Sequence, residues 1–346
     1  MVKSLNQEKP DEQFLFGYQI EENSESMQAV ILAAGAGRRL HPLTLDRSKG
    51  MLPILGKPIV ERVVEHFVSI GINDFILVVH PHDRSITRYF QHESHTNADI
   101  RFVYQENPIG TADALKKAVP LIEGDFYLSA CDNLITPDYL AKMKMIWNSD
   151  HEINALLTLM EVEENQLTQS AAVELKEDQI LRIIEKPSPG ETRSKIVSLP
   201  LYCFSQEFLT LLPEIEPSPR TEYEIQSGIQ LLIDRYGGVR GVDIDSRITI
   251  TTPEDLLNIN QQYLTAGFEQ PQIQPQAVGK SSHLTSPLYI EKGTIIGANC
   301  IIGPNVYLEK NCIIGDNVEI TDSVILREVE ISPNTKINNQ IVSKSR

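Results

Sequence analysis

Near its C-terminus the chain carries a six-residue repeat, which narrows the folds open to this region more than any other feature. The first row of the repeat consists of Ile290, Ile296, Ile302, Leu308, Ile314, Ile320 and Leu326. A second, apolar or small row follows four positions after most of these residues, at Cys300, Val306, Cys312, Val318 and Val324. Such hexads are typical of a parallel β-helix, in which each hexad forms one face of a triangular coil. The spacing slips by one at Ile331 and resumes at Ile337, which predicts a bulge or a capping coil there.

The longer part of the chain before this repeat shows a different pattern. Between residues 28 and 267, short apolar runs alternate with segments of helical periodicity. The expected strands are 29–32, 75–79, 100–104 and 125–128, and the expected helices are 59–70, 84–91 and 112–118. This alternation predicts a Rossmann-like α/β domain with a mostly parallel sheet covered on both faces. Ligands of such sheets bind beyond the carboxyl ends of the strands.

These patterns divide the 346 residues into four parts. Residues 1–26 are polar and are interpreted as a mobile leader. The α/β domain is expected at 27–267, and a linker rich in Gln, Pro and Ser at 268–286. The β-helix is expected at 287–346.

Composition excludes several classes of function. The net charge of −16 argues against a nucleic-acid or anionic-membrane partner, and any phosphate ligand would need a local cluster of cations. No apolar run is long enough to cross a membrane, and the N-terminus lacks the apolar core of a secretory signal. The four cysteines form no CxxC pair, which indicates reduced thiols in a cytoplasmic protein.

The segment after the first expected strand supplies such a cluster of cations. Residues 32–40 read LAAGAGRRL, so that small residues allow close backbone approach to a ligand and two arginines, Arg38 and Arg39, follow. The segment lacks the third glycine of a dinucleotide-binding fingerprint and the GK[ST] ending of a P-loop. Alone, it indicates an anion-binding turn without naming the ligand.

The continuation of this segment is far more specific. Residues 42–58 read PLTLDRSKGMLPILGKP, and with the preceding loop they resemble the signature of the nucleoside-diphosphate-sugar pyrophosphorylase family, LAAGxGxRLxPLT followed by PKxxLPVxGKP. Further similar segments follow in the family's order: QENPIGTADA at 105–114, CDN at 131–133, EKP at 185–187 and TPEDL at 252–256. The resemblance covers most of residues 28–267. It implies a nucleotidyltransferase that makes an NDP-sugar and pyrophosphate from a sugar-1-phosphate and a nucleoside triphosphate, and several branches carry a C-terminal left-handed β-helix.

The resemblance also implies roles for individual residues. Arg39 and Lys49 would bind the departing pyrophosphate and the phosphates at the reacting centre. The nucleotide would contact Leu32, Ala33, Ala34, Gly35, Gly37, Gln105, Gly110 and Thr111. The sugar phosphate would contact Glu185, Lys186 and Ser198. Asp132 would hold Mg²⁺, with Asp245 as the second metal ligand, and the chemistry would be mainly positioning and charge neutralisation.

Departures from the family pattern leave parts of the site open. Pro200 stands in the sugar-contacting loop where the family has Gly, which predicts an unusual sugar pocket. Thr249 stands where many members have the second metal-binding Asp, so that Asp245, rather than Asp243, is the favoured ligand. Residues 248–253 also resemble the cytidylyltransferases of isoprenoid synthesis. A cytidylyltransferase for a non-sugar alcohol phosphate therefore stays an alternative.

Two further alternatives concern the architecture. A non-catalytic regulatory subunit would share this two-part organisation, but the phosphate-binding residues it could lose are present: Arg39, Lys49, Asp132 and Lys186. An acyltransferase activity of the β-helix is disfavoured because the repeat is short and only His283 lies near it. The β-helix is instead interpreted as a homo-oligomerisation or regulatory module. The base remains open among uridylyl, thymidylyl and guanylyl relatives.

Overall fold

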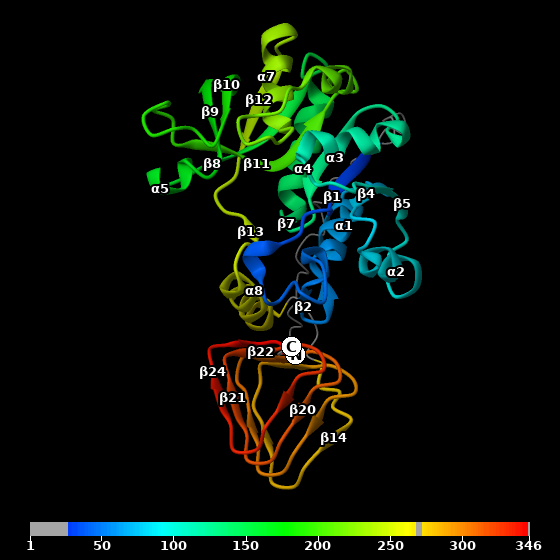
Figure 1. The fold of residues 1–346 in the computed structure, drawn as a ribbon, viewed down its shortest axis with the longest axis vertical. Coiled ribbons are helices and arrows are strands. Elements are labelled where there is room, and N and C mark those ends of the chain that lie inside the picture. The colour runs from blue at the N-terminus through cyan, green and yellow to red at the C-terminus, as the bar shows by residue number, and fades with distance from the viewer. Residues whose placement is uncertain (1–26, 268–271, 345–346) are drawn as a thin grey trace, which may run out of the picture.

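The computed structural model describes residues 27–267 and 272–344, and the expected leader at 1–26 lies outside the described residues. An α/β domain and a three-sided stack of short strands follow each other along the long axis of the molecule (Figure 1). Within the described ranges, no helix has the length and apolar character required to span a bilayer.

The α/β domain is built on one nine-stranded sheet of order β5-β4-β1-β6-β11-β8-β12-β10-β9. The strands of this domain are β1 (Gln28–Leu32), β2 (Pro53–Ile54), β3 (Lys57–Pro58), β4 (Asp74–Val79), β5 (Asp99–Tyr104), β6 (Phe126–Ala130), β7 (Asn133–Leu134), β8 (Ala155–Glu161), β9 (Ala171–Lys176), β10 (Gln179–Glu185), β11 (Ile196–Phe204), β12 (Val239–Asp243) and β13 (Ile248–Thr249). The four strands expected from sequence, β1, β4, β5 and β6, are parallel neighbours. Antiparallel β11 joins this half to the rest of the sheet.

Helices cover both faces of this sheet. They are α1 (Ile59–Ser69), α2 (Arg84–His92), α3 (Thr111–Ala118), α4 (Pro137–Ser149), α5 (Glu164–Leu167), α6 (Phe208–Leu211), α7 (Ile225–Arg235) and α8 (Pro253–Ala266), with short 3₁₀ turns η1 (Arg38–Leu40), η2 (Lys49–Met51), η3 (Val119–Leu121) and η4 (Leu212–Glu214). Along β1, Ala29 and Ile31 belong to one buried apolar cluster and Val30 to another. Alternating side chains thus feed two cores, as a sheet buried on both faces requires.

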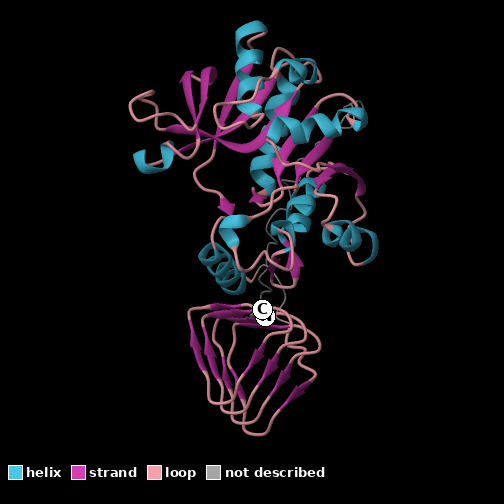
Figure 2. Ribbon diagram, viewed as in Figure 1, coloured by secondary structure: helices cyan, strands magenta, loops and turns pink. Residues whose placement is uncertain are grey.

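The C-terminal part consists of short strands joined by turns (Figure 2). Its strands are β14 (Ala277–Val278), β15 (His283–Leu284), β16 (Leu288–Ile290), β17 (Ile295–Ile296), β18 (Ile301–Ile302), β19 (Val306–Leu308), β20 (Ile313–Ile314), β21 (Glu319–Thr321), β22 (Ser323–Ile325), β23 (Glu330–Ile331), β24 (Lys336–Asn338) and β25 (Ile341–Val342). They form three four-stranded parallel sheets, which fit the short left-handed β-helix expected from sequence. The sheets begin at β14, inside the range expected to be linker, because Val278 and Leu284 continue the six-residue spacing and pair with Ile296 and Ile302.

The irregularity in the repeat lies earlier than expected. Leu308 pairs with Ile325, not with Leu326, so one residue is missing between Ile320 and Ile325. The corner residues in the left-handed conformation show the same step, since Asn317 is followed by Asp322 after five residues instead of six. Ile325 therefore takes the inward position in the β-helix core, and Leu326 packs into the core of the α/β domain. The slip was expected at Ile331 because Leu326 is apolar and continues the six-residue spacing of the repeat. Leu326 is apolar because it packs against the α/β domain, not because it faces the core of the β-helix.

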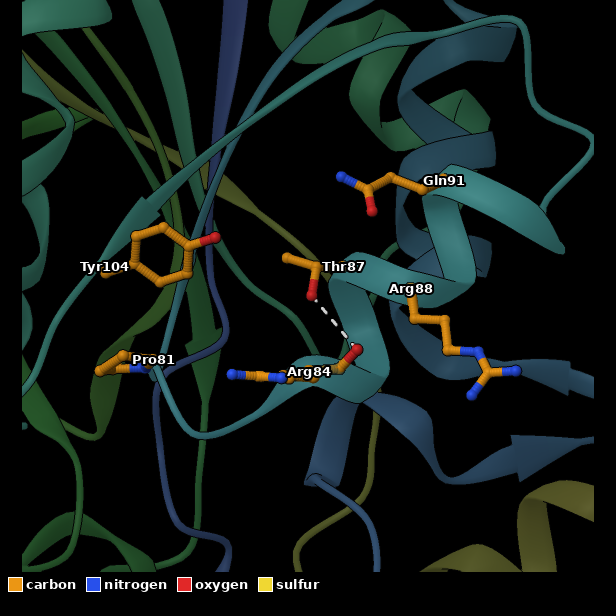
Figure 3. Close-up of a pocket in the computed structure, with 6 residues that line it drawn as sticks. All are labelled: Pro81, Arg84, Thr87, Arg88, Gln91 and Tyr104. Carbon is orange, nitrogen blue, oxygen red and sulfur yellow. Dashed lines mark hydrogen bonds between the residues drawn. The ribbon is translucent and has the colours of Figure 1, made fainter.

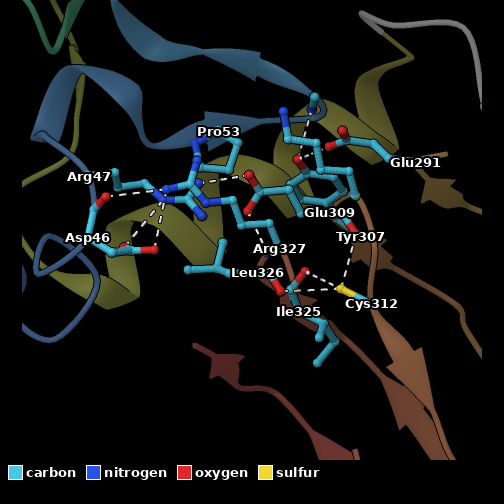
Figure 4. A network of polar contacts seen from close by, with 12 residues as sticks. Asp46, Arg47, Pro53, Glu291, Tyr307, Glu309, Cys312, Ile325, Leu326 and Arg327 are labelled. Atoms are coloured by element: carbon cyan, nitrogen blue, oxygen red, sulfur yellow. Dashed lines mark hydrogen bonds and ion pairs between the residues drawn. The ribbon is translucent and has the colours of Figure 1, made fainter. Parts of the chain in front are cut away.

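One face of the β-helix is the domain interface. The outward residues of the sheet β16-β19-β22-β25 join the α/β core, among them Tyr289, Tyr307 and Val324. Polar contacts lie beside this apolar surface (Figure 4). The hydroxyl of Tyr307 accepts a hydrogen bond from the Gly56 backbone N–H at 3.1 Å and donates one to the carboxylate of Glu291. The two domains are therefore joined by a continuous buried interface.

Glu291 should make this interface sensitive to pH. Burial raises the pKa of Glu291 from 4.5 to about 7, and the nearby charge of Glu309 adds to the rise, whereas Tyr307, Lys310 and Arg47 oppose it. Folding thus favours the protonated carboxyl, whose stabilising contribution is complete below pH 4.5 and is lost as the pH rises towards 7. We expect Glu291→Gln to raise the free energy of unfolding at pH 8 by about 3 kcal/mol relative to wild type. Urea unfolding at pH 5 and pH 8 measures this, and a difference independent of pH would contradict it.

Candidate active site

A cavity of about 370 Å³ opens beyond the carboxyl ends of β1, β5 and β6. It is lined by residues that are expected from sequence to bind two different ligands. From the expected nucleotide site come Leu32, Ala34, Gly35, Gln105, Gly110 and Thr111, and from the expected sugar-phosphate site come Glu185 and Lys186. The remaining expected residues, Ala33, Gly37, Arg39, Lys49, Asp132, Ser198 and Asp245, do not line this cavity. The fold thus brings together segments that are far apart in the sequence, with room for a ligand between them.

The loop after β1 is held at the edge of the sheet by its backbone. Ala33 N–H donates to the carbonyl of Val78 at 2.8 Å, and Leu32 accepts from Cys131 N–H at 3.1 Å. Gly37 has φ 60°, a left-handed conformation that suits glycine, and it begins the 3₁₀ turn η1. Arg39 lies in η1, where it is exposed and makes no hydrogen bond or ion pair with any described residue. Its guanidinium is therefore available to an anion.

Gln105 and Gly110 form the wall opposite this loop. Gln105 is buried, and its side-chain amide donates to the Gly110 carbonyl at 3.1 Å and to the Asp113 carboxylate at 2.8 Å. Among the described residues, nothing donates to its side-chain oxygen. Gly110 has φ 137° and packs directly on the backbone of Tyr223. This wall is rigid, with one amide oxygen left to accept a hydrogen bond.

Lys49 and Asp132 meet in a second group of contacts. Asp132 follows β6, two residues after the cavity-lining Ala130, and its side chain is 11% exposed. Lys49 begins η2, and its Nζ lies 2.5 Å from Asp132 Oδ2. Thr249 in β13 donates from Oγ1 to the same oxygen at 2.8 Å. The structure thus pairs two of the expected charged residues and adds a threonine at the position where many members have a second Asp.

These donors suit magnesium at one carboxylate. Mg²⁺ is usually held by one or two carboxylates together with substrate phosphates, which Asp132 can satisfy. Asp245 is exposed, and within residues 27–267 and 272–344 no cluster of three or more His, Cys, Asp or Glu side chains is arranged to hold a metal. Asp132 could therefore hold Mg²⁺ jointly with phosphate oxygens, and the part of Asp245 stays a prediction.

Arg247 also belongs to this group of charges, and it is not among the site residues expected from sequence. β13 pairs antiparallel with β7, next to Asp132, and Arg247 stands two residues before Thr249. Arg247 directly precedes β13 and lies close enough to Asp132 for the carboxylate charge to act on its guanidinium. Burial lowers the pKa of Arg247, and the neighbouring Asp132 and Tyr202 oppose that shift. It makes no hydrogen bond or ion pair with a described residue. No local pattern in the sequence marks it, because its place beside Asp132 depends on the pairing of β13 with β7.

The other end of the cavity carries a carboxylate and an ammonium group. Glu185 ends β10, and the Nζ of Lys186 lies 3.5 Å from its Oε1. Burial raises the pKa of Glu185, while Lys186 lowers it. Tyr202, Pro200 and Gln226 line the same cavity, and Gln226 Nε2 donates to the Tyr202 hydroxyl at 3.4 Å. Ser198 is buried within β11. The segment that departs from the family pattern was expected to be a loop, but it lies within β11, where the pairing with β8 is irregular between Ser198 and Tyr202, and it contributes Pro200 and Tyr202 to the cavity.

A second hollow lies at the edge of the sheet, between α2 and the end of the edge strand β5 (Figure 3). Its volume is about 610 Å³, and its lining includes Arg84, Arg88 and the exposed ring of Tyr104. None of the residues expected from sequence lines it. The smaller cavity is therefore the candidate site for the expected chemistry.

Comparison with known proteins agrees with this geometry. The family model described as nucleotidyl transferase matches residues 28–266, and the GMPPB C-terminal domain model matches residues 284–346. The UTP–glucose-1-phosphate uridylyltransferase AglF of Haloferax volcanii is 32% identical over 231 residues, covering 66% of this chain and 93% of AglF. The bifunctional protein GlmU of Methanococcus maripaludis is 30% identical over 278 residues, covering 79% of this chain. This chain spans only 62% of the length of that relative.

The fold is also found among solved structures. A UDP-glucose pyrophosphorylase complexed with UDP-glucose matches with a TM-score of 0.63 and 21% identity, covering 70% of this chain and all of that protein. This likeness concerns the fold, whereas the match of a family model over most of the chain concerns descent. The match of this family model, together with the signature loop, the Lys49–Asp132 pair and the cavity, shows that the chain belongs to the nucleotidyl transferase family.

Proposed function

We propose that this protein joins a sugar-1-phosphate to a nucleoside triphosphate, releasing pyrophosphate and an NDP-sugar. One observation carries the proposal: a single cavity is lined both by the phosphate loop with Gln105 and Gly110 and by Glu185 with Lys186. The names of AglF and of the UDP-glucose pyrophosphorylase describe activities of this class in relatives. The unusual Pro200 in the cavity leaves the identity of the sugar open.

Nucleotidyl transfer depends mainly on neutralising the negative charge of the phosphate oxygens. A phosphate oxygen of the sugar-1-phosphate attacks the α-phosphorus, and the bond to the bridging oxygen of the departing pyrophosphate breaks. Exposed Arg39 would bind the pyrophosphate, Lys49 the phosphates at the reacting centre, and Lys186 the phosphate of the sugar. Glu185 would accept a hydrogen bond from a sugar hydroxyl. Mg²⁺, held by Asp132 and phosphate oxygens, would offset negative charge as the phosphates come together.

The wall formed by Gln105 offers the base a hydrogen-bond acceptor. Its side-chain amide nitrogen is committed to Gly110 and Asp113, which leaves its oxygen free to accept. Uracil, thymine and guanine can donate to such an oxygen from a ring N–H, and adenine and cytosine can donate from an exocyclic amino group. UTP, dTTP and GTP are the proposed donors because the Gln105 and Gly110 segment resembles that of uridylyl, thymidylyl and guanylyl members, and the acceptor is compatible with all three.

A substrate matrix tests the proposal. Pyrophosphate release would be measured with Mg²⁺ for five nucleoside triphosphates against a panel of sugar-1-phosphates and of alcohol phosphates. Signal with one sugar-1-phosphate, lost in an Asp132→Asn variant, is the expected result. Signal confined to CTP with an alcohol phosphate would replace the proposal by the cytidylyltransferase alternative. Silence throughout, with folded protein, would favour a regulatory subunit.

Arg247 is proposed as a further phosphate-binding residue of this reaction. It is a half-buried cation beside Asp132 and makes no hydrogen bond or ion pair with the described residues. We expect Arg247→Ala to lower kcat/KM by about tenfold, because one charge-assisted contact to the substrate phosphates is lost. Arg247→Lys should restore part of the rate, since the charge returns without the planar fork. Initial rates of pyrophosphate release measure both, and a wild-type rate in Arg247→Ala would contradict the assignment.

We also propose that the β-helix forms homo-oligomers. Ile295 and Ile313 lie in register on neighbouring strands, with their side chains outward and 37% and 44% exposed. This apolar ladder lies on a different sheet from the one that faces the α/β domain. Light scattering at micromolar concentration tests the assembly, and a monomer for the wild-type chain would contradict it.

A cytoplasmic location is proposed for the same protein. All four cysteines are free and buried. Unpaired thiols suit a reducing compartment, where nucleoside triphosphates are also available. Fractionation of cells that express the tagged chain tests the location.

A further inference from the structure

Arg47 lies two residues before Lys49, yet its side chain belongs to the domain interface. The side chain of Arg47 is 3% exposed, and its Nη1 lies 2.8 Å from Oε1 of Glu309, which comes from the β-helix. The close view of the network shows Arg47 and Glu309 directed at each other across the boundary between the domains (Figure 4). The chain that carries Lys49 is therefore attached to the second domain at this point.

Glu309 is itself fixed by its second oxygen. Oε2 accepts a hydrogen bond from the Arg327 backbone N–H at 2.7 Å, and the Glu309 side chain is only 7% exposed. The guanidinium of Arg327 returns to the α/β domain, where it lies 3.3 Å from the carboxylate of Asp46. Asp46, Arg47, Glu309 and Arg327 thus form a closed ring of contacts across the interface. If one of these four residues were displaced, the two residues that it contacts would lose a partner.

The same segment also supports the phosphate loop. Thr44 donates from Oγ1 to the Gly37 carbonyl at 3.0 Å. A Cβ atom added at Gly37 would lie only 3.3 Å from the Cβ of Lys49, so that the two backbones pack closely. A shift of residues 44–49 would consequently have two effects: it would move Lys49 relative to Asp132, and it would disturb the phosphate loop.

A buried ion pair is an inefficient way to stabilise an interface. Desolvation of two charges offsets much of their attraction, and an apolar pair of similar volume often stabilises as well or better. The directional contact does, however, hold the Arg47 side chain in one place. Resting on the proposed function, we propose that Glu309 of the β-helix is a positioning residue for Lys49 and acts through Arg47. The β-helix then serves the reaction without contacting the substrates.

Kinetics of single variants give the first test. Glu309→Gln keeps the size of the side chain and an oxygen for Arg327 but removes the charge that holds Arg47. We expect kcat to fall at least about tenfold, while KM for both substrates stays within about twofold of the wild-type value. A displaced catalytic group loses more of its contact with the transition state than with the bound substrates. Gln261→Ala is the matched control, since it removes another interdomain hydrogen bond, from Gln261 Nε2 to the Asp322 carbonyl at 2.8 Å. Its kcat should stay at the wild-type value.

A double variant separates positioning from stability. Arg47→Met with Glu309→Gln removes both charges and keeps an oxygen for the Arg327 N–H, so that it should recover the Tm lost in Glu309→Gln. If Glu309 positions Lys49, this variant recovers Tm but keeps the low kcat. Recovery of kcat together with Tm would overturn the inference, as would an unchanged kcat in Glu309→Gln.

Hydrogen exchange tests the inference independently of turnover. In Glu309→Gln, but not in Gln261→Ala, amide exchange in residues 44–51 is expected to become faster. Unchanged exchange would overturn the inference even if the wild-type protein proved inactive in the substrate matrix. Wild-type inactivity alone would count against the proposed function, so the two failures are distinguishable.

Discussion

Replacing Asp132 by Asn is expected to lower kcat by about a hundred- to a thousandfold while leaving the protein folded. Asn keeps the shape of the side chain and an oxygen for the hydroxyl of Thr249, which lies 2.8 Å from Asp132 Oδ2. It removes the only negative charge in contact with Lys49 within the described residues. The variant would thus lose the proposed Mg²⁺ ligand and leave Lys49 and Arg247 without a counter-charge. The rate of pyrophosphate release, measured as a function of Mg²⁺ concentration, checks this result.

Asp245→Asn is the matched control for this prediction. Asp245 is an exposed carboxylate on the same segment as Thr249, but no described contact joins it to Asp132. A loss confined to Asp132→Asn would assign metal binding to a single carboxylate. An equal loss in Asp245→Asn would support the expectation from sequence that Asp245 is the second ligand. A wild-type rate in Asp132→Asn would refute the proposed site.

Gly110→Ala is expected to lower the free energy of unfolding by more than about 4 kcal/mol. Gly110 has φ 137° and ψ 167°, a region that essentially only glycine adopts. A Cβ atom there would lie 2.2 Å from the carbonyl oxygen and 2.5 Å from the nitrogen of Tyr223. These are backbone atoms, held by the hydrogen bonds of Tyr223 to Ile109 and Ala112, at 2.8 and 2.9 Å, so they cannot yield as a flexible side chain would. Urea unfolding followed by circular dichroism measures the loss.

Gly190→Ala separates the clash from the backbone conformation. Gly190 also has a positive φ, 81°, but nothing lies within 4 Å of the added Cβ. Its substitution should cost only about 1–2 kcal/mol. If both variants lost the same stability, the contact with Tyr223 would not be the cause. The activity of surviving Gly110→Ala protein should also fall, because Gly110 lines the cavity and accepts from Gln105.

Local patterns in the sequence predicted the first half of the sheet well. Each expected strand and helix between residues 29 and 128 is present within one or two residues, from β1 to β6. These elements are strongly periodic and are separated by turn residues, so local signals suffice. The antiparallel strand β11 and the order of the strands beyond it depend on pairing between distant segments. No local period encodes that pairing.

The site shows the same division. Motifs in the sequence were enough to select four candidate site residues: Arg39, Lys49, Asp132 and Lys186. Each of these charged residues lies in a short motif that can be recognised without knowledge of the fold. Arg247 was missed, because its proximity to Asp132 depends on the pairing of β13 with β7. Arg47 was also missed, since within the signature segment it reads as one more cation of the phosphate site. Its partner Glu309 lies 262 positions away.

By itself, the sequence determined the two kinds of domain, because hexad spacing and alternating strand and helix periods are properties of neighbouring residues. It also determined the phosphate loop, since backbone approach and positive charge there are local. Only the tertiary structure decided which charges face one another: Asp132 with Lys49 and Thr249, and Arg47 with Glu309. The reason is physical, since a charge separated by many residues acquires its partner, its burial and its role only when packing brings the distant segments within a few ångströms.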